Sequence, residues 1–229
     1  MPDLHRFHEL LQGIERPADA EFLYDRGTPD GALRAANLDR YLDLMAGAGA
    51  TTMLVAEAPG YRGATITGVP FFSVRELTAR PGLITGDPDG DGFAVPADAD
   101  YGWELSASVV QKALRGWPVP AVAWPVYPLH PFRAPDRATN RAPRPAEVRA
   151  GAPIALELIA AFGIERVIAV GRKAQGALAA AGVDAIPVRH PAQGGAAIFA
   201  ERMRELAPRD TRGQAPSGGE ISRSARSAR

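Results

Sequence analysis

Four short apolar runs constrain the fold of this chain more than any other feature of its sequence. They lie at residues 51–56, 119–124, 166–170 and 185–188, and runs of this length and hydropathy are typical of strands covered on both faces. Stretches with helical periodicity precede and separate them, at residues 4–14, 33–45, 103–115, 146–162, 173–180 and 195–206. This alternation predicts an α/β fold, a three-layer α/β/α sandwich with a four-stranded, mainly parallel central sheet.

The length and composition indicate one folded domain followed by a polar tail. The chain has 229 residues, of which 46% are hydrophobic and 23% charged, close to the averages of globular proteins. After Ala207 the sequence is rich in Arg, Ser, Gly and Pro and lacks apolar anchors. We therefore expect a single domain over residues 1–207 and a disordered basic tail over residues 208–229.

The absence of cysteine excludes several cofactors and chemistries. Without a thiol the chain cannot form a disulfide, a thiolate zinc site, a Cys-ligated iron–sulfur cluster or a Cys nucleophile. No apolar run approaches the roughly 18 residues of a membrane span or the pattern of a signal peptide. The sequence thus predicts a protein with no cofactor and no membrane partner, in a reducing, cytoplasmic compartment.

Charge is distributed unevenly between the two halves of the chain. Residues 1–110 hold 17 acidic and 8 basic side chains, whereas residues 111–229 hold 9 acidic and 18 basic ones. One stretch of the basic half contains five arginines, namely Arg133, Arg137, Arg141, Arg144 and Arg149. A basic face of this kind suits a polyanion, although a solvated arginine-rich loop is the simpler interpretation of the charge alone.

Three polar loops follow the predicted strands, at residues 57–70, 125–145 and 189–195. In open α/β sheets, ligands bind outside the carboxyl ends of the strands. In the first loop Glu57 precedes a Pro-Gly turn, which places a carboxylate where it can position water or accept a proton. In the last, His190 directly follows a strand and precedes Gly194-Gly195. Taken separately, the two are equally compatible with a surface glutamate in a turn and a capping histidine.

Together, in this order and spacing, the two loops resemble the uracil-DNA glycosylase superfamily. Its members carry a first motif of the type Gly-Glu-Ala-Pro-Gly after the first strand, then an aromatic residue that stacks on the base, and a late motif that begins His-Pro. We match residues 56–60 to the first motif, Phe72 to the aromatic residue and His190-Pro191 to the late motif. The resemblance covers residues 50–206 and includes Tyr61 to Ser73, Ser106-Ala107, Pro128 to Pro131 and Asn140-Arg141.

The resemblance implies a metal-independent hydrolase that cleaves the N-glycosidic bond of a flipped-out uracil or other deaminated base in DNA, as in base excision repair. Glu57 would orient the attacking water and His190 would stabilise the leaving base. Such an enzyme acts as a monomer, and in a bacterial-type cytoplasm it works at the nucleoid. The implied base-binding residues are Ala58, Gly60, Tyr61, Phe72 and Pro125, and the implied DNA-binding residues are Arg62, Arg141, Pro191, Ala192, Gln193 and Gly194.

Two positions depart from the superfamily pattern. Members usually place an asparagine that reads the uracil edge at the end of the third strand, where this chain has Pro125. Members with narrow specificity carry a tyrosine at the position of Gly60, so we expect a wider pocket here. Loss of the amide weakens base reading, which leaves a second hypothesis, a catalytically weak or inactive protein that binds DNA or a damaged base. A third is an unrelated α/β enzyme that acts on a small heterocycle or nucleotide.

One acidic loop has the spacing of a calcium site. Asp87, Asp89, Asp91 and Asp98 stand at positions 1, 3, 5 and 12 of an EF-hand-like loop, with Gly92 at position 6. Prolines occupy positions 88 and 96, where flanking helices are expected, and the last ligand is Asp rather than Glu. The sequence leaves open both calcium binding and a solvated acidic turn.

Overall fold

A four-stranded parallel sheet forms the centre of the protein, whose computed structural model describes residues 1–97 and 102–208. Its strands are β2 (Thr52–Ala56), β3 (Val122–Pro125), β5 (Arg166–Val170) and β6 (Ile186–Val188), in the order β3-β2-β5-β6. Each neighbouring pair is parallel, with Met53 opposite both Val122 and Val167. The prediction of an α/β fold with a four-stranded parallel sheet is therefore confirmed.

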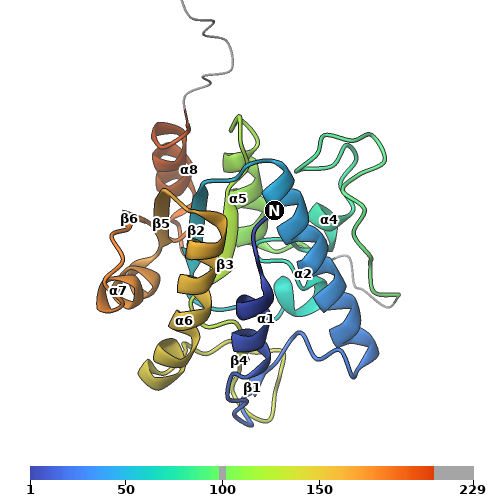
Figure 1. Cartoon of the computed structure of the whole chain (residues 1–229), viewed down its shortest axis with the longest axis vertical. Coiled ribbons are helices and arrows are strands. Elements are labelled where there is room, and N and C mark those ends of the chain that lie inside the picture. The colour runs from blue at the N-terminus through green and yellow to red at the C-terminus, as the bar shows by residue number, and fades with distance from the viewer. Residues whose placement is uncertain (98–101, 209–229) are drawn as a thin grey trace, which may run out of the picture.

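Helices cover both faces of this sheet (Figure 1). One face packs against α1 (His5–Gln12), α2 (Pro29–Gly47), α6 (Pro145–Phe162) and α7 (Arg172–Ala180). The other face packs against α5 (Leu105–Leu114) and α8 (Ala196–Glu205). Successive side chains of a strand point to opposite faces, so Met53 and Val55 join the first core and Leu54 the second. All three are fully buried, as the continuous apolar run predicts.

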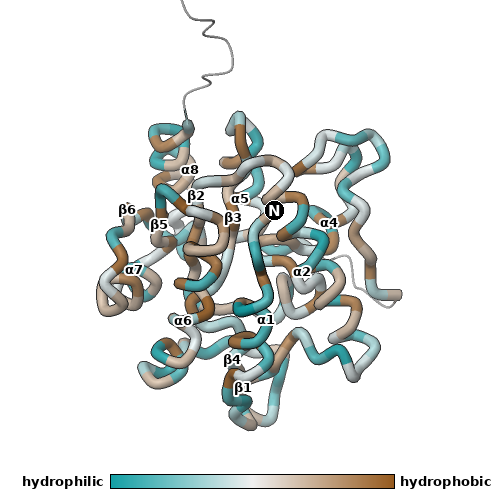
Figure 2. The backbone as a smooth tube through the Cα atoms, in the orientation of Figure 1, coloured by the Kyte–Doolittle hydropathy of each residue, from teal (hydrophilic) through white to brown (hydrophobic). Residues whose placement is uncertain are grey.

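Hydrophobic and hydrophilic residues alternate along the helices, which Figure 2 shows as brown and teal segments of the tube. Local sequence signals fix several of their ends. The hydroxyl of Thr28 accepts a hydrogen bond from Gly31 N–H at 3.1 Å, which caps α2 where the Thr-Pro-Asp sequence predicts a helix start. Gly163 ends α6 in the left-handed conformation (φ 59°), as is common at the C-terminus of a helix.

Four short elements escape prediction. A second sheet pairs β1 (Ala20–Glu21) with β4 (His130–Pro131) in antiparallel fashion, and two single-turn helices, α3 (Ala64–Thr67) and α4 (Val74–Leu77), follow β2. None is long enough to show a period in the sequence. The β1–β4 pair brings the N-terminal segment against the arginine-rich loop that follows β3.

Candidate active site

A cavity of about 970 Å³ opens at the carboxyl ends of the central strands. It is lined by residues 56–60, 63–64, 70–71, 104, 106, 125, 140–143, 170–173, 175, 187–190 and 192–193. All three polar loops that follow the predicted strands contribute to it. The structure therefore brings Glu57 and His190 together, although 133 positions separate them in the sequence.

Glu57 follows directly after β2, so the sheet edge holds its carboxylate at the cavity wall. Its side chain is 32% exposed, and Oε1 lies 3.4 Å from Lys173 Nζ at the start of α7. Among the described residues no group donates a hydrogen bond to that buried oxygen. A buried carboxylate oxygen without a donor is costly unless water or a ligand supplies one, and Glu57 is one of the residues that line the cavity.

His190 is held from two sides by glycines that leave room for it. A Cβ on Gly171 (φ 89°) would lie 3.3 Å from His190 Cβ, and a Cβ on Gly195 would lie 2.0 Å from His190 O. The backbone N–H of Ala192 donates to His190 Nδ1 at 3.1 Å. Because Nδ1 accepts this bond, the proton of the neutral ring is on Nε2, and the cavity wall thus carries an N–H donor.

Burial keeps that ring neutral. Removal from water lowers the pKa of His190 below its ordinary value of 6.5, and this outweighs the opposite effect of the carboxylates of Glu104 and Glu57. Glu104 was not among the expected site residues. It caps α5 by accepting hydrogen bonds from Ser106 N–H at 2.9 Å and Ala107 N–H at 2.5 Å, and it also lines the cavity.

The expected stacking aromatic, Phe72, is in the wrong place for that role. Its ring is 1% exposed and packs edge-on against Tyr41 and Phe93 in the core. The neighbouring Phe71 lines the cavity instead. It adopts a left-handed backbone conformation (φ 56°), and Gln111 Nε2 donates to its carbonyl at 3.2 Å. Phe71 is therefore the aromatic ring available to a ligand.

The remaining base-binding residues divide into two groups. Ala58, Gly60 and Pro125 line the cavity, and Pro125 ends β3 opposite Ala56 without a polar side chain. Tyr61 does not line it. Its N–H donates to Asn140 Oδ1 at 3.1 Å, and its ring lies beneath the Arg62 guanidinium at 5.2 Å. Asn140 also fills part of the room expected beside Gly60, because a Cβ there would lie 3.7 Å from Asn140 Nδ2.

Two of the expected DNA-binding residues, Arg141 and Pro191, make contacts within the protein. Arg141 donates to Asp19 Oδ1 at 3.1 Å and to Glu147 Oε1 at 2.6 Å, with only 14% of its side chain exposed. This network lies at the start of α6 and leaves Arg141 no free donor face for phosphate. Pro191 is buried, so it stiffens the loop from within. Arg62, Gln193 and Gly194 are exposed and Ala192 lines the cavity, and their contact with DNA stays a prediction.

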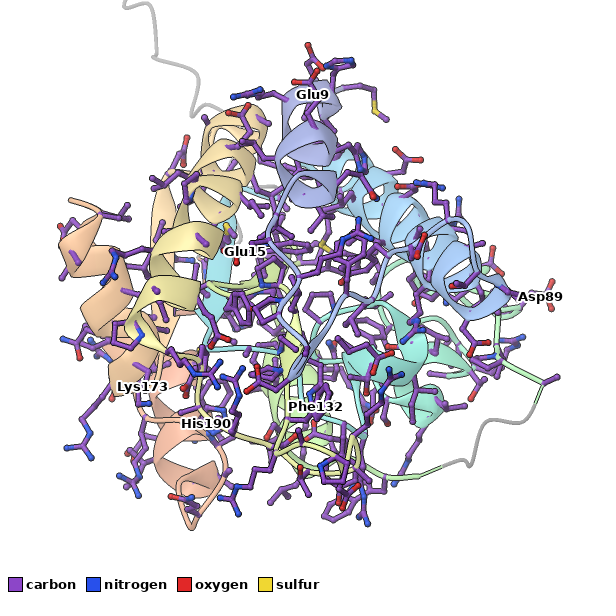
Figure 3. The ribbon with its side chains drawn as sticks, turned by 90° about the horizontal axis from the view of Figure 1, so that it is seen from below. Glu9, Glu15, Asp89, Phe132, Lys173 and His190 are labelled. Carbon is purple, nitrogen blue, oxygen red and sulfur yellow. The ribbon has the colours of Figure 1, made fainter. Side chains whose placement is uncertain are left out.

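One wall of the cavity is cationic, which the sequence interpretation missed. Arg172 and Lys173 come from the first turn of α7, and Arg189 from the end of β6. Figure 3 shows Lys173 and His190 on the same side of the molecule, away from Glu9 on α1. The signal in the sequence is a pair of basic residues, Arg172 and Lys173, shortly after the strand at residues 166–170.

The acidic loop forms no metal site in the described part of the chain. Asp91 is buried and accepts hydrogen bonds from Ile84 N–H, Thr85 N–H and the Thr85 hydroxyl. Asp98 lies outside the described residues. Within residues 1–97 and 102–208, no three acidic or histidine side chains cluster as metal ligands would, and no helix combines the length and hydropathy that a membrane span requires.

Comparisons with known proteins identify no relative, so the proposed function rests on the geometry of the site. No protein-family model matches the sequence, and no curated protein matches it significantly.

Proposed function

We propose that this protein is a DNA glycosylase of the uracil-DNA glycosylase type, which hydrolyses the bond between deoxyribose and a flipped-out deaminated base. One observation carries the proposal. Glu57, whose Oε1 has no hydrogen-bond donor among the described residues, and a neutral His190 with its ring proton on Nε2 line the same cavity, at the carboxyl edge of a parallel sheet. This pair supplies the two functions that hydrolysis of a glycosidic bond to a base requires.

The first function is to stabilise the positive charge that develops on the sugar as the glycosidic bond breaks. The Glu57 carboxylate orients the attacking water and stabilises positive charge at C1′. The second is to stabilise the negative charge on the departing base. His190 donates from Nε2 to a carbonyl oxygen of the base, and it does so as the neutral ring because of its lowered pKa.

The cavity also offers features suited to a planar base. Its volume of about 970 Å³ is within the range of small-molecule sites, and stacking on Phe71 offsets part of the cost of unstacking a base from DNA. Asn140 places an amide beside Gly60, with its oxygen occupied by Tyr61 N–H. Its NH₂ group is then left to read a base edge in place of the side chain that Pro125 lacks.

A second candidate function rests on Pro125. The end of β3 presents a proline to the cavity, so a base would lose one polar partner and with it selectivity or rate. On this view the protein binds DNA or a damaged base without cleaving it. The two functions share the cavity and differ only in whether abasic sites form.

A single-turnover assay separates them. Full-length protein in excess is incubated with end-labelled oligonucleotides that carry uracil, hypoxanthine or xanthine, and alkali then reveals abasic sites. We expect cleavage of at least one substrate, and a rate ~10²–10³-fold lower for His190→Ala. Glu57→Gln removes the charge that orients water and should lose activity by a similar order.

Matched control variants make the outcome specific. Glu165→Gln and His5→Ala introduce the same chemical changes at exposed positions outside the cavity, and both should cleave at the wild-type rate. Absence of abasic sites with every substrate, while the DNA is bound and released by salt, would support the binding protein instead. Cleavage that survives in both Glu57→Gln and His190→Ala would place the chemistry elsewhere.

A further inference from the structure

The cavity contains one of only two lysines in the chain. The sequence has 24 arginines but only Lys112 and Lys173, so positive charge elsewhere is almost always supplied by arginine. The distinction matters chemically, because a guanidinium stays protonated in proteins whereas a lysine amine can act as a nucleophile. Lys112 is exposed on the last turn of α5, outside the cavity. Lys173 lines the cavity beside Glu57.

The surroundings of Lys173 suit a nucleophile. The side chain is 60% exposed, and its sole ion pair in the described part of the chain is with Glu57, at 3.4 Å. The amine is therefore not locked into a network such as the one around Arg141. The same carboxylate is the nearest acceptor for its proton. An atom that approaches Glu57 closely enough to react there also comes within reach of Lys173 Nζ.

We infer that Lys173 gives this protein a second activity, cleavage of the DNA strand at an abasic site through an imine. The inference rests on the proposed function, which places C1′ of the damaged nucleotide beside Glu57. After base release, C1′ of the ring-opened sugar is an aldehyde. Glu57 takes a proton from the Lys173 ammonium, and the amine adds to C1′. The proton then returns to the departing hydroxyl, so one water leaves and a cationic imine forms.

Strand cleavage follows by β-elimination. Glu57 accepts the proton from C2′, and the electrons of that C–H bond form the C2′=C3′ double bond as the C3′–O bond breaks. The 3′ phosphate leaves with the electrons of the C3′–O bond. One water then hydrolyses the cationic imine, which releases an unsaturated aldehyde and restores the Lys173 ammonium. The proton that Glu57 took from C2′ passes to solvent, which restores the carboxylate. The sequence consumes no oxidant or metal.

Reductive trapping tests this directly. The full-length protein is incubated with an oligonucleotide that already contains an abasic site, in the presence of sodium borohydride, which reduces the imine to a stable amine. We expect a covalent protein–DNA complex for the wild type and for Lys112→Arg. Lys173→Arg retains the positive charge beside Glu57 but cannot form an imine, so the trapped fraction should fall by at least ~10-fold. The linked peptide should contain residue 173.

The outcomes keep the two proposals apart. Preformed abasic DNA bypasses base excision, so trapping at Lys173 without release of uracil would support the lyase and overturn the glycosylase. Release of uracil without trapping would support the glycosylase and overturn the lyase. Equal trapping by wild type and Lys173→Arg, or attachment at Lys112 or the N-terminal amine, would overturn the inference.

Discussion

At the residue scale, the hydrogen bond from Ala192 N–H to His190 Nδ1 determines what this histidine can do. The bond suits the neutral ring, since protonation would set an N–H at Nδ1 against the N–H of Ala192. Burial lowers the pKa of His190, so the ring takes up its proton only at pH values below its ordinary range near 6.5. The donor role of Nε2 is thus fully available at neutral pH.

A pH profile follows from this. The single-turnover rate should be flat between about pH 7 and 8 and should fall on the acid side only below about pH 6.5. The fall has this sign because a lowered pKa delays protonation as pH decreases. Comparison with His190→Gln isolates the ring, since the acid limb due to His190 should vanish in that variant. An acid limb centred above pH 6.5, or one unchanged in His190→Gln, would contradict the assignment.

Alanine substitutions of the two adjacent phenylalanines, Phe71 and Phe72, should have opposite effects on stability and on base excision. Phe72 is buried between Tyr41 and Phe93, so Phe72→Ala should lower the free energy of unfolding by about 3–5 kcal/mol. Phe71 is only partly buried against the second core, so Phe71→Ala should lower thermal stability less than Phe72→Ala. It should reduce base excision by roughly 5–150-fold, as expected for loss of 1–3 kcal/mol of base stacking. Thermal denaturation and single-turnover rates measure the two effects. The reverse pattern would return Phe72 to the cavity.

The sequence could not decide between these two rings. Both are large and apolar, and which one faces the cavity depends on the left-handed backbone of Phe71, a conformation that sequence pattern does not predict for a phenylalanine. Glu57 and His190 could be predicted, because each lies within two residues of the end of a predicted strand and the ends of parallel strands meet at one edge. The Nε2–H tautomer of His190 depends on a single backbone contact and was beyond such reasoning.

At the element scale, the start of α6 depends on an ion network around Arg141. Arg141 and Arg144 both bind Asp19 and Glu147, which connects α6 to the segment before β1. Arg141→Met should lower the free energy of unfolding by about 3 kcal/mol, since it removes the more buried of the two arginines that pair with the buried Glu147. For a chain of this size the melting temperature would fall by roughly 6–12 °C.

The control for Arg141 is Arg133, an exposed arginine of the same loop whose guanidinium has no partner among the described residues. Arg133→Met should change stability by less than about 0.5 kcal/mol. DNA affinity should be unaffected by Arg141→Met at temperatures where the variant is folded.

The ion network around Arg141 also predicts that the protein loses stability in acid. Hydrogen bonds from Arg144 and Arg141 lower the pKa of Asp19 to about 2. The contribution of the ionised Asp19 to the free energy of unfolding is therefore present above about pH 4 and is lost as pH falls toward 2.

The longer elements could be predicted from period alone, and the short ones could not. The strand at 166–170 has the expected bounds, and the other three begin within three residues of the expected position. In contrast, β1 and β4 have two residues each and exist only because segments more than 100 positions apart meet. The role of Arg141 depends on the same meeting, since Asp19 is 122 positions away, and the sequence, in which the resemblance implied contact with DNA, could not show this partner.

At the scale of the whole molecule, the uneven charge of the chain appears as a cationic wall on the cavity. Arg172 and Arg189 are exposed there, and Arg62 is exposed on the first loop, so the cavity is flanked by cations that carry no sequence information. Although the formal net charge is zero, this local arrangement should attract the phosphates on both sides of a flipped nucleotide.

The affinity for DNA should therefore fall as the salt concentration rises, and the steepness of this fall reports the number of phosphate contacts. Dissociation constants measured for a Glu57→Gln variant, which should not consume its substrate, are plotted as the logarithm of affinity against the logarithm of salt concentration. Arg172→Met should lower the magnitude of the slope by about 1, the value expected for loss of one phosphate contact. Arg6→Met provides the matched control, since Arg6 lies on α1 and pairs with Glu9 at 3.0 Å. Figure 3 shows Glu9 far from Lys173 and His190. Affinity that does not depend on salt, or equal slopes for the two variants, would show that the cavity wall does not bind the DNA backbone and would favour a small heterocyclic ligand.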